Sequence, residues 1–386
     1  MIELIIILFF TFFVVILFSQ FGVIVNERDI NSNGEFRWNR YYFVSFIILT
    51  LFIGTREGVG RDFYTYIENY YTEGQIFEAI ESREFGYIWL SNILHFFNLD
   101  YHSFFLATSF ITVLLLFNSF KNFYQLLPIG ILLFFIGGMF GFVINGVRQG
   151  IAMMAFYNAL RFISWDEVKK NELEKFFWFS FYIAVGALFH YSIIAFIPFY
   201  FILQKRFLSL FNPLILSIIV ISGFFINANS FLANFSNSVV KLISLFKNRS
   251  DLTSNILELG GFHIGAFFIL LVNLAPFLFF NKVTKESPAA RLYFVLFAIG
   301  TGLMYAFSQY LLIHRIILYL SFCSIFVYPY TYFYFKRQSQ QNFNYLFLNI
   351  SILSFLLVKF IYSLPEFMES DILKNNFSLW FIPLIK

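Results

Sequence analysis

Apolar residues form long runs along most of the chain, and polar residues are gathered in short intervals between them. Runs of 18 or more residues recur from Met1 to beyond Tyr362, and the intervals rarely exceed 15 residues. A membrane-spanning helix needs about 20 apolar residues, whereas membrane β-strands are shorter and alternate in polarity. The pattern therefore predicts an all-α polytopic membrane protein, a single integral membrane domain over residues 1–386 with about 11–13 transmembrane helices.

The first segment has neither a preceding basic region nor a small-residue cleavage site, so we expect it to be retained as a span. With this segment included, twelve spans fit the pattern. The predicted spans are Ile5–Val25, Tyr41–Phe52, His102–Phe120, Leu126–Val143, Gly146–Ile163, Phe176–Phe189, Ser192–Leu203, Leu208–Ile226, His263–Phe280, Arg291–Gln309, Ile316–Phe335 and Phe343–Tyr362. The run Phe176–Leu203 would be about 42 Å long as one helix, so we expect it to turn back near His190. The shorter stretch Phe85–Leu99 is predicted to be a re-entrant or interfacial helix within an extracytoplasmic loop, 54–101.

Basic residues are concentrated in one set of connecting segments, and this sets the predicted orientation. The segments 26–40, 121–125, 161–175, 204–207, 281–291 and 336–342 hold 15 Lys and Arg against 8 Asp and Glu. Cytoplasmic loops are enriched in Lys and Arg, so these segments are predicted to be cytoplasmic. Both termini are then predicted to lie outside. The loops 54–101 and 227–262 then share the outer face with Asn145–Gln149, His190 and His314-Arg315.

The amino-acid composition excludes further classes of protein. Only 12% of the residues are charged, against about 25% in soluble domains. The one cysteine, Cys323, lies inside an apolar segment, which excludes a secreted disulfide scaffold. The net charge is +4 and no basic stripe is present, so nucleic acid is not an expected partner.

The loop after the second predicted span combines glycines with two arginines and an aspartate. Gly58 and Gly60 free the backbone, while Arg56, Arg61 and Asp62 supply charge. Such a loop suits an anionic headgroup, because Arg presents paired donors to phosphate oxygens in a rigid fork. The alternative is a solvated outer loop with incidental charges, since a GxG pattern that does not follow a strand is weak evidence.

The segment from Asn145 to Gly150 interrupts two apolar runs with side chains rich in hydrogen-bond donors. An arginine at membrane depth, such as Arg148, costs at least about 2.5 kcal/mol on insertion scales, so it normally faces a wet cavity or an anionic partner. The alternative is an arginine at a helix end whose head reaches the interface.

His190 has apolar neighbours on both sides, and His314-Arg315 lies in an apolar segment one helical turn before Tyr319. Such a histidine is more often a satisfied core residue, unless a reaction needs a proton acceptor near neutral pH. The five histidines show no metal-ligand spacing, and no cofactor fingerprint or nucleophile elbow is present. Neither a metal nor a cofactor is therefore expected.

Taken in order, these motifs resemble the EpsG-type, Wzy-like bacterial polysaccharide polymerases. The family's elements and their matches are R-x-G-V-G-x-D-(Y/F)-x-x-Y at Arg56–Tyr66, E-x-G-aromatic at Glu84–Tyr87, N-G-(I/V)-R-Q-(G/A)-(I/L)-A at Asn145–Ala152, (L/F)-F-H-x-S at Leu188–Ser192 with Pro198, and R-x-x-x-Y at Arg315–Tyr319. The first and third elements are the most specific. Arg61 stands where the family commonly has a small or polar residue, so no role is carried over to it.

The resemblance implies a GT-C-like glycosyltransferase of the bacterial inner membrane, with extracytoplasmic loops forming a site on the periplasmic face. Such polymerases move a growing glycan from undecaprenyl diphosphate onto the next undecaprenyl-diphosphate-linked repeat unit. The expected partners are these lipid-linked donor and acceptor oligosaccharides, membrane lipid, a chain-length regulator and a flippase. The implied roles are diphosphate binding for Arg56, Arg148 and Arg315, catalysis for His190, Asp62 and Glu84, and support for Asn145, Gln149, Tyr66 and Tyr319.

Three arginines on the diphosphate would make a metal unnecessary, and either His190 or Asp62 could take the acceptor proton. His190 is favoured, because an unperturbed histidine titrates near ~6.5 and Asp62 lies among arginines. A lipid-oligosaccharide flippase is the main rival, although it would be expected to show repeat-related cavities. An O-antigen ligase and a membrane O-acyltransferase also remain open, as does the choice of O-antigen, capsule or exopolysaccharide.

Overall fold

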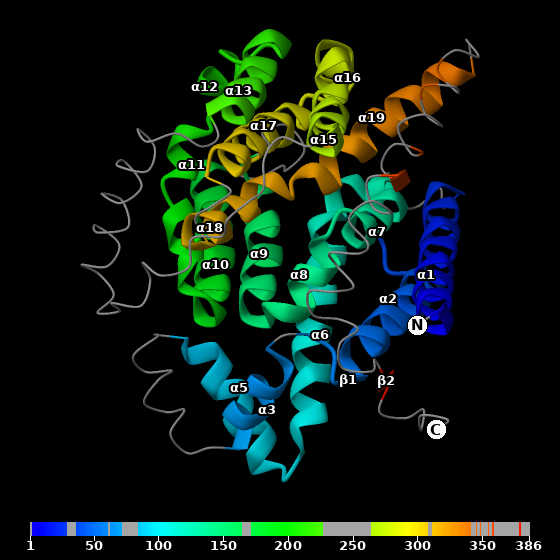
Figure 1. Cartoon of the computed structure of the whole chain (residues 1–386), viewed down its shortest axis with the longest axis vertical. Coiled ribbons are helices and arrows are strands. Elements are labelled where there is room, and N and C mark those ends of the chain that lie inside the picture. Colours follow the sequence, from blue (N-terminus) through cyan, green and yellow to red (C-terminus); the bar gives the residue numbers. More distant parts are fainter. Residues whose placement is uncertain are drawn as a thin grey trace. The chain divides into compact units, whose positions relative to one another are not determined.

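A computed structural model describes most of the chain as two compact units, residues 1–204 with 357–386 and residues 205–356. The described residues are 2–28, 36–60, 62–71, 84–163, 171–226, 264–307 and 311–340, with residues 345, 348, 354, 357, 358, 378 and 379. The predicted 227–262 loop, Arg61 and most of the predicted span Phe343–Tyr362 lie outside them. Helices dominate both units (Figure 1).

The first unit contains most of the residues that the sequence singled out. Its elements are α1 (Ile2–Arg28), α2 (Arg40–Gly54), β1 (Arg56–Glu57), α3 (Phe63–Tyr71), α5 (Phe85–Phe96), α6 (Tyr101–Ser119), η2 (Lys121–Leu126), α7 (Leu127–Ile136), α8 (Met139–Asn145), α9 (Val147–Leu160), α10 (Glu172–Phe189), η3 (Tyr191–Phe196), α11 (Phe199–Ile202) and β2 (Ser378–Leu379). The two-residue strands β1 and β2 pair antiparallel.

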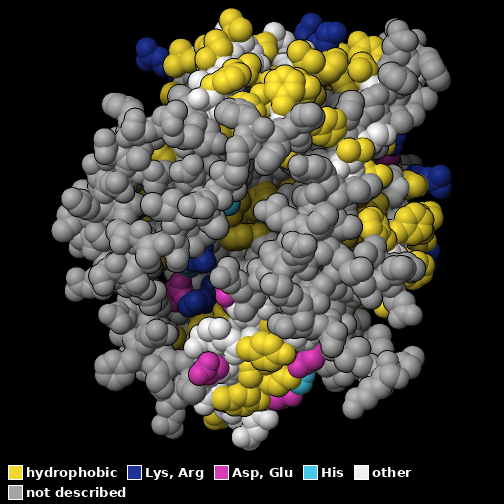
Figure 2. Space-filling view, viewed as in Figure 1, with side chains coloured by type: hydrophobic (Ala, Val, Ile, Leu, Met, Phe, Trp, Pro, Cys, Tyr) yellow, Lys and Arg dark blue, Asp and Glu magenta, His cyan; other side chains and the backbone are white. Residues whose placement is uncertain are grey.

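Phenylalanine supplies much of the core of this unit. The ring of Phe12 on α1 stacks on Phe135 of α7 with centroids 4.0 Å apart, and it meets Phe140 of α8 edge-on at 5.2 Å. Other aromatic side chains of α1 face outward, and Phe10 and Phe13 are more than 60% exposed. Figure 2 shows hydrophobic side chains over the right side of the visible face, where α1 lies in Figure 1. A helix that is apolar all round is expected where its outer face meets lipid.

Several described helices are long and apolar enough to cross a membrane. They are Ile7–Arg28, Tyr101–Ser119, Phe267–Glu286 and Ile313–Ser339, with a fifth if the bent pair Lys121–Ile136 and Met139–Asn145 is one span. Shorter apolar helices coincide with four further predicted spans, at Arg40–Gly54, Tyr191–Ile202, Pro213–Phe225 and Ala290–Ala306. The prediction of an all-α polytopic membrane protein is confirmed, and the charge-based orientation stays a prediction.

The predicted span Leu126–Val143 is broken. Its helical parts, ending at Ile136 and starting again at Met139, are bent by 65°. Gly138 has φ of +84°, a left-handed conformation that L-residues with a side chain rarely adopt, so the helix cannot continue through it. The break lets α8 leave the line of α7 and carry the chain to the Asn145–Gly150 segment.

The run Phe176–Leu203 turns back at His190, as predicted. The backbone of His190 is extended, with φ −152° and ψ 118°, and it ends α10. The following η3 and α11 return along α10, so that the Tyr200 hydroxyl donates to the carbonyl of Glu172 at 3.0 Å. His190 therefore lies at the tip of a helical hairpin.

The second unit is also helical. Its elements are α12 (Lys205–Leu208), α13 (Pro213–Ile226), α15 (Ile264–Leu274), η5 (Ala275–Phe279), α16 (Phe280–Glu286), α17 (Ala290–Ala306), α18 (Leu311–Ser321) and α19 (Ser324–Ser339). Helices α13 and α17 cross where Gly223 meets Gly302. The backbones are so close there that a Cβ on Gly223 would overlap the Gly302 carbonyl. Small residues at such a crossing allow the two backbones to approach closely, as is common between membrane helices.

Candidate active site

Three side chains that are distant in the sequence meet in the first unit. Glu84 immediately precedes α5, Arg148 lies in the first turn of α9, and His190 ends α10. One carboxylate oxygen of Glu84 accepts from the Nη1 of Arg148. The other lies 2.7 Å from the Nδ1 of His190. We call these three residues the Glu84 centre.

The three side chains differ in their exposure. The Glu84 side chain is only 6% exposed, whereas that of His190 is 22% and that of Arg148 34% exposed. A buried carboxylate is costly unless it is paired and hydrogen-bonded, and here Arg148 and His190 supply both partners. The carboxylate is thus enclosed, while its two partners keep surface through which they can reach a substrate.

The glycine of the E-x-G-aromatic element explains how Glu84 reaches the other two residues. A Cβ on Gly86 would lie 2.8 Å from the Cβ of Leu188 and 3.0 Å from its carbonyl oxygen. Glycine therefore lets α5 pack directly on the last turn of α10. This close approach carries Glu84, at the start of α5, to His190, two residues after Leu188.

Two tyrosines hold the Arg148 guanidinium. Its central carbon lies 5.8 Å from the ring centroid of Tyr66 and 5.3 Å from that of Tyr87. The Tyr66 hydroxyl is also within hydrogen-bonding range of Arg148. Burial raises the pKa of the Tyr66 phenol and the charge of Arg148 partly offsets this, so the phenol stays neutral at physiological pH. Cation–π contact and the bond to Glu84 together orient the guanidinium.

The Asn145–Gly150 segment is a break between two helices, as its polar composition predicted. Gly146 lies between α8 and α9, and among the residues that the structure describes no side chain caps the start of α9. The Asn145 amide bonds back to the carbonyl of Gly141 at 3.1 Å, and Gln149 is buried within the first turn of α9. The backbone N–H groups and the positive dipole end of α9 therefore lie beside Arg148, an arrangement that favours an anion.

Arg56, predicted to bind a diphosphate, is buried at the base of the glycine-rich loop. Its Nη1 donates to the carbonyl of Ile53 at 2.8 Å and its Nη2 to that of Ile144 at 3.3 Å, while the guanidinium stacks on Phe105. Burial lowers the pKa of Arg56 to about 10, so it remains charged at neutral pH. In this structure Arg56 joins the loop to the end of α8, instead of facing outward as Arg148 does.

The rest of the glycine-rich loop packs on the same junction. Gly60 has φ of +104°, and a Cβ there would lie 3.0 Å from the side-chain oxygen of Asn145. Asp62 immediately precedes α3, and its carbonyl accepts from the backbone N–H of Tyr66 at 2.9 Å. The loop thereby places Tyr66 beside Arg148, whereas its role in binding substrate stays a prediction.

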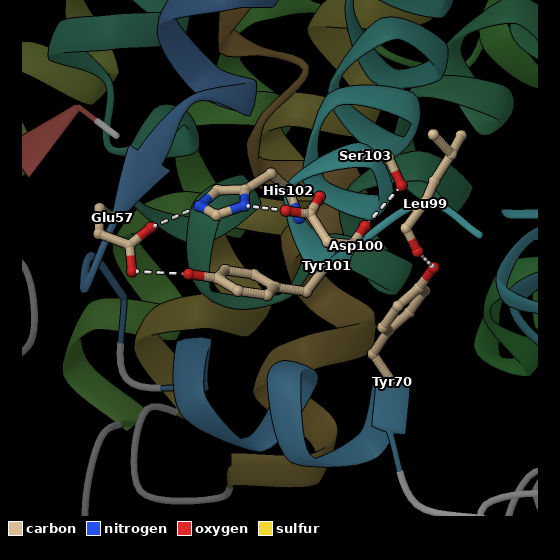
Figure 3. Close-up of polar contacts among 7 residues, drawn as sticks. All are labelled: Glu57, Tyr70, Leu99, Asp100, Tyr101, His102 and Ser103. Atoms are coloured by element: carbon tan, nitrogen blue, oxygen red, sulfur yellow. Dashed lines mark hydrogen bonds and ion pairs between the residues drawn. The ribbon is translucent and has the colours of Figure 1, made fainter. Parts of the chain in front are cut away.

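A second polar cluster lies at the start of α6 (Figure 3). The His102 ring bridges two carboxylates, with Nε2 3.2 Å from Glu57 and Nδ1 2.8 Å from Asp100, and the Tyr101 hydroxyl donates to Glu57 at 3.0 Å. Burial acts to raise the pKa of Asp100, but the hydrogen bond and charge of His102 outweigh it and lower the pKa. The cluster ties Glu57, next to Arg56, to α6. It was not expected from the sequence.

The remaining predicted residues, Arg315 and Tyr319, lie on α18 in the second unit. Arg315 is exposed and Tyr319 is fully buried. Their roles stay predictions. Across the described parts of both units, no group of three or more His, Cys, Asp or Glu side chains is placed to hold a metal ion.

The order of motifs agrees with a comparison of the chain with known families. Residues 39–373 match the model of the EpsG family. The chain belongs to the EpsG family. Membership gives this EpsG-family protein a polysaccharide polymerase-type, glycosyltransferase-like role and agrees with its several apolar helices, which fit a multi-pass membrane protein. Searches of curated proteins and of solved structures gave no match.

The main residue that sequence reasoning passed over is Tyr87, which it named only as the aromatic of its motif. The signal was its place three residues after Glu84, one helical turn away and on the same face. Glu84 was predicted as a site residue, but nothing in the order of residues showed that its carboxylate would join Arg148 to His190.

Proposed function

We propose that this protein polymerises lipid-linked oligosaccharide repeat units. In this reaction a growing glycan moves from undecaprenyl diphosphate onto the next undecaprenyl-diphosphate-linked unit at the outer face of the inner membrane. The observation that carries the proposal is the Glu84 carboxylate, which joins a partly exposed arginine to a partly exposed histidine. An anion-binding group beside a proton acceptor is what transfer from a diphosphate requires.

His190 is proposed as the general base. Its Nδ1 faces Glu84, so Nε2 is the nitrogen that takes the proton of the acceptor hydroxyl. The carboxylate orients the ring and stabilises the imidazolium as it forms, as the acidic member does in a catalytic triad. Among the described residues, only the backbone carbonyl of Asp62 is bonded, to the N–H of Tyr66, and we assign the base to His190 because its ring meets the Glu84 carboxylate.

Arg148 is proposed to hold the diphosphate. Its guanidinium has five N–H donors, and the bond to Glu84 uses one nitrogen, so others can meet phosphate oxygens. The uncapped start of α9 adds backbone N–H groups and a positive dipole at the same place. We assign Arg56 a supporting role, because it is buried and its guanidinium bonds to two backbone carbonyls. Diphosphate binding by Arg315 stays a separate prediction.

The proposed reaction balances without any further reactant. The acceptor oxygen attacks the anomeric carbon of the donor glycan, and the bond from that carbon to the diphosphate oxygen breaks. Undecaprenyl diphosphate leaves with the bonding electron pair, and its developing negative charge is met by Arg148. The acceptor proton passes to His190 and is later released to water.

The outward face of α5 suits a substrate that remains in lipid. Phe85, Trp89, Ile93 and Phe96 are all exposed, and their spacing places them along one side of the helix. With 12 residues, α5 is about 18 Å long and too short to cross a hydrocarbon core of about 30 Å. We therefore propose that α5 lies at the membrane interface, where tryptophan is favoured, with Glu84 at its start.

The decisive experiment compares the surface glycan of cells that lack this gene with that of cells carrying His190→Gln. Glycan that carries one repeat unit in both strains supports polymerisation. Absence of glycan from the outer face would indicate a flippase instead. Full-length chains that remain on undecaprenyl diphosphate would indicate a ligase. Either of these last two results contradicts the proposal.

A further inference from the structure

The hydroxyl of Tyr87 is buried and has no hydrogen-bond partner among the residues that the structure describes. The side chain is 3% exposed, and its ring packs edge-on against Phe104 with centroids 5.2 Å apart. The same ring lies beneath the Arg148 guanidinium. The ring therefore has a clear packing role, but the hydroxyl does not contribute to it.

A buried hydroxyl without a partner destabilises a protein, because its hydrogen bonds to water are lost and not replaced. Phenylalanine would supply the same ring for Phe104 and Arg148 without this cost. A tyrosine at this position is therefore explained best if the hydroxyl gains a partner in another state of the site.

The Tyr87 ring lies against Arg148, a member of the Glu84 centre, with 5.3 Å between the ring centroid and the guanidinium carbon. Burial raises the pKa of the Tyr87 phenol, Arg148 opposes this, and Glu84 acts in the same direction as burial. Both charged groups thus lie within electrostatic range of the hydroxyl. Glu84 immediately precedes α5 and Tyr87 lies three residues later in its first turn, so the two residues lie on the same side of the helix start.

Glu84 is the member of the centre that would need a new partner. In this structure one of its oxygens accepts from Arg148 and the other is hydrogen-bonded to His190. If Arg148 turns toward an anionic substrate, the first oxygen loses its donor while the carboxylate remains buried. A buried carboxylate with an unsatisfied oxygen is unfavourable, so a nearby donor would lower the cost of this movement.

We propose that Tyr87 is a positioning residue whose hydroxyl replaces Arg148 on the Glu84 carboxylate when Arg148 engages the diphosphate of the substrate. This inference rests on the proposed function for the identity of the anion. The hydroxyl donates to the oxygen that Arg148 has left, and the bond between Glu84 and His190 is kept. The base thereby stays oriented while the arginine changes partner.

The test measures binding of farnesyl diphosphate to the purified full-length protein, together with the melting temperature of the ligand-free protein. Tyr87→Phe removes the hydroxyl and keeps the ring. We expect the Kd to rise about tenfold, since a hydrogen bond to a charged group is lost only in the bound state. The melting temperature should stay the same or rise, because an unpartnered hydroxyl has been removed.

Tyr42→Phe is the matched control. Tyr42 on α2 is fully buried and its hydroxyl also has no partner among the described residues, and the ionisable groups that act on it, Tyr124 and Glu27, are not members of the Glu84 centre. Its removal should change the melting temperature in the same direction and leave the Kd unchanged. A second measurement repeats Tyr87→Phe in a Glu84→Gln background, where the loss of affinity should be much smaller because the carboxylate is gone.

The outcomes separate this inference from the proposed function. If the wild-type protein binds farnesyl diphosphate, Arg148→Lys weakens binding, and Tyr87→Phe leaves the Kd within twofold, only the role of Tyr87 is refuted. The same conclusion follows if Tyr87→Phe loses stability and affinity together, as a packing role would predict. If the wild-type protein does not bind the probe, both the anion site and this inference are refuted.

Discussion

Glu84→Gln is the most informative single substitution, because it removes the negative charge between Arg148 and His190 while keeping the shape of the side chain. The carboxylate accepts one charge-assisted bond from each neighbour. The amide has only one acceptor atom, so one bond is lost and the other becomes a bond to a neutral group. The base loses its orienting partner, and the arginine loses one of its supports.

The size of the effect follows from these two bonds. A hydrogen bond to a charged group contributes about 1.5–3 kcal/mol, and one to a neutral group about 1 kcal/mol. Because Arg148 and His190 are partly exposed, water compensates some of the loss. We expect a net loss of about 2–3 kcal/mol in transition-state stabilisation, which corresponds to a roughly 30- to 150-fold lower turnover.

The assay is polymer formation from lipid-linked repeat units by the purified protein in lipid nanodiscs, with the melting temperature as a control for folding. Glu57→Gln is the matched variant, because Glu57 also meets a histidine and a second donor but belongs to the cluster at the start of α6. It should retain nearly full turnover. Turnover of folded Glu84→Gln protein within threefold of the wild type would refute the reasoning.

Four further predictions concern the same site and the orientation of the chain. Arg148→Lys keeps the charge but loses the two-pronged fork, so polymer length should fall sharply while membrane insertion is retained; wild-type polymer would contradict this. His190→Gln should abolish the chemical step and leave donor affinity nearly intact, whereas Asp62→Asn should retain measurable turnover, and the reverse pattern in single-turnover kinetics would assign the base to Asp62. Polymerisation by purified protein should persist in excess EDTA, and loss of turnover that Mg²⁺ or Mn²⁺ restores would overturn this. In a cysteine-free background, a cysteine at Glu73 should react with a membrane-impermeant reagent from outside and one at Asn171 should not; the opposite labelling would invert the topology.

Much of the helical framework was determined by local sequence. The apolar runs specify membrane helices, since a helix satisfies its own backbone hydrogen bonds in lipid. The polar segment at Asn145–Gly150 marked the break between α8 and α9, and the excessive length of Phe176–Leu203 marked the turn at His190. These features depend on residues that are close in the chain, so the sequence alone could predict them.

The arrangement of the candidate site was decided by tertiary packing. Arg56 and Arg148 are similar as sequence signals, yet one is enclosed by backbone carbonyls and the other is partly exposed beside Glu84. Glu84 meets His190 because Gly86 lets α5 pack closely on α10, a contact between segments about a hundred residues apart. Which polar groups become partners depends on such long-range approaches, whose energies are set by packing and burial and cannot be derived from local residue patterns.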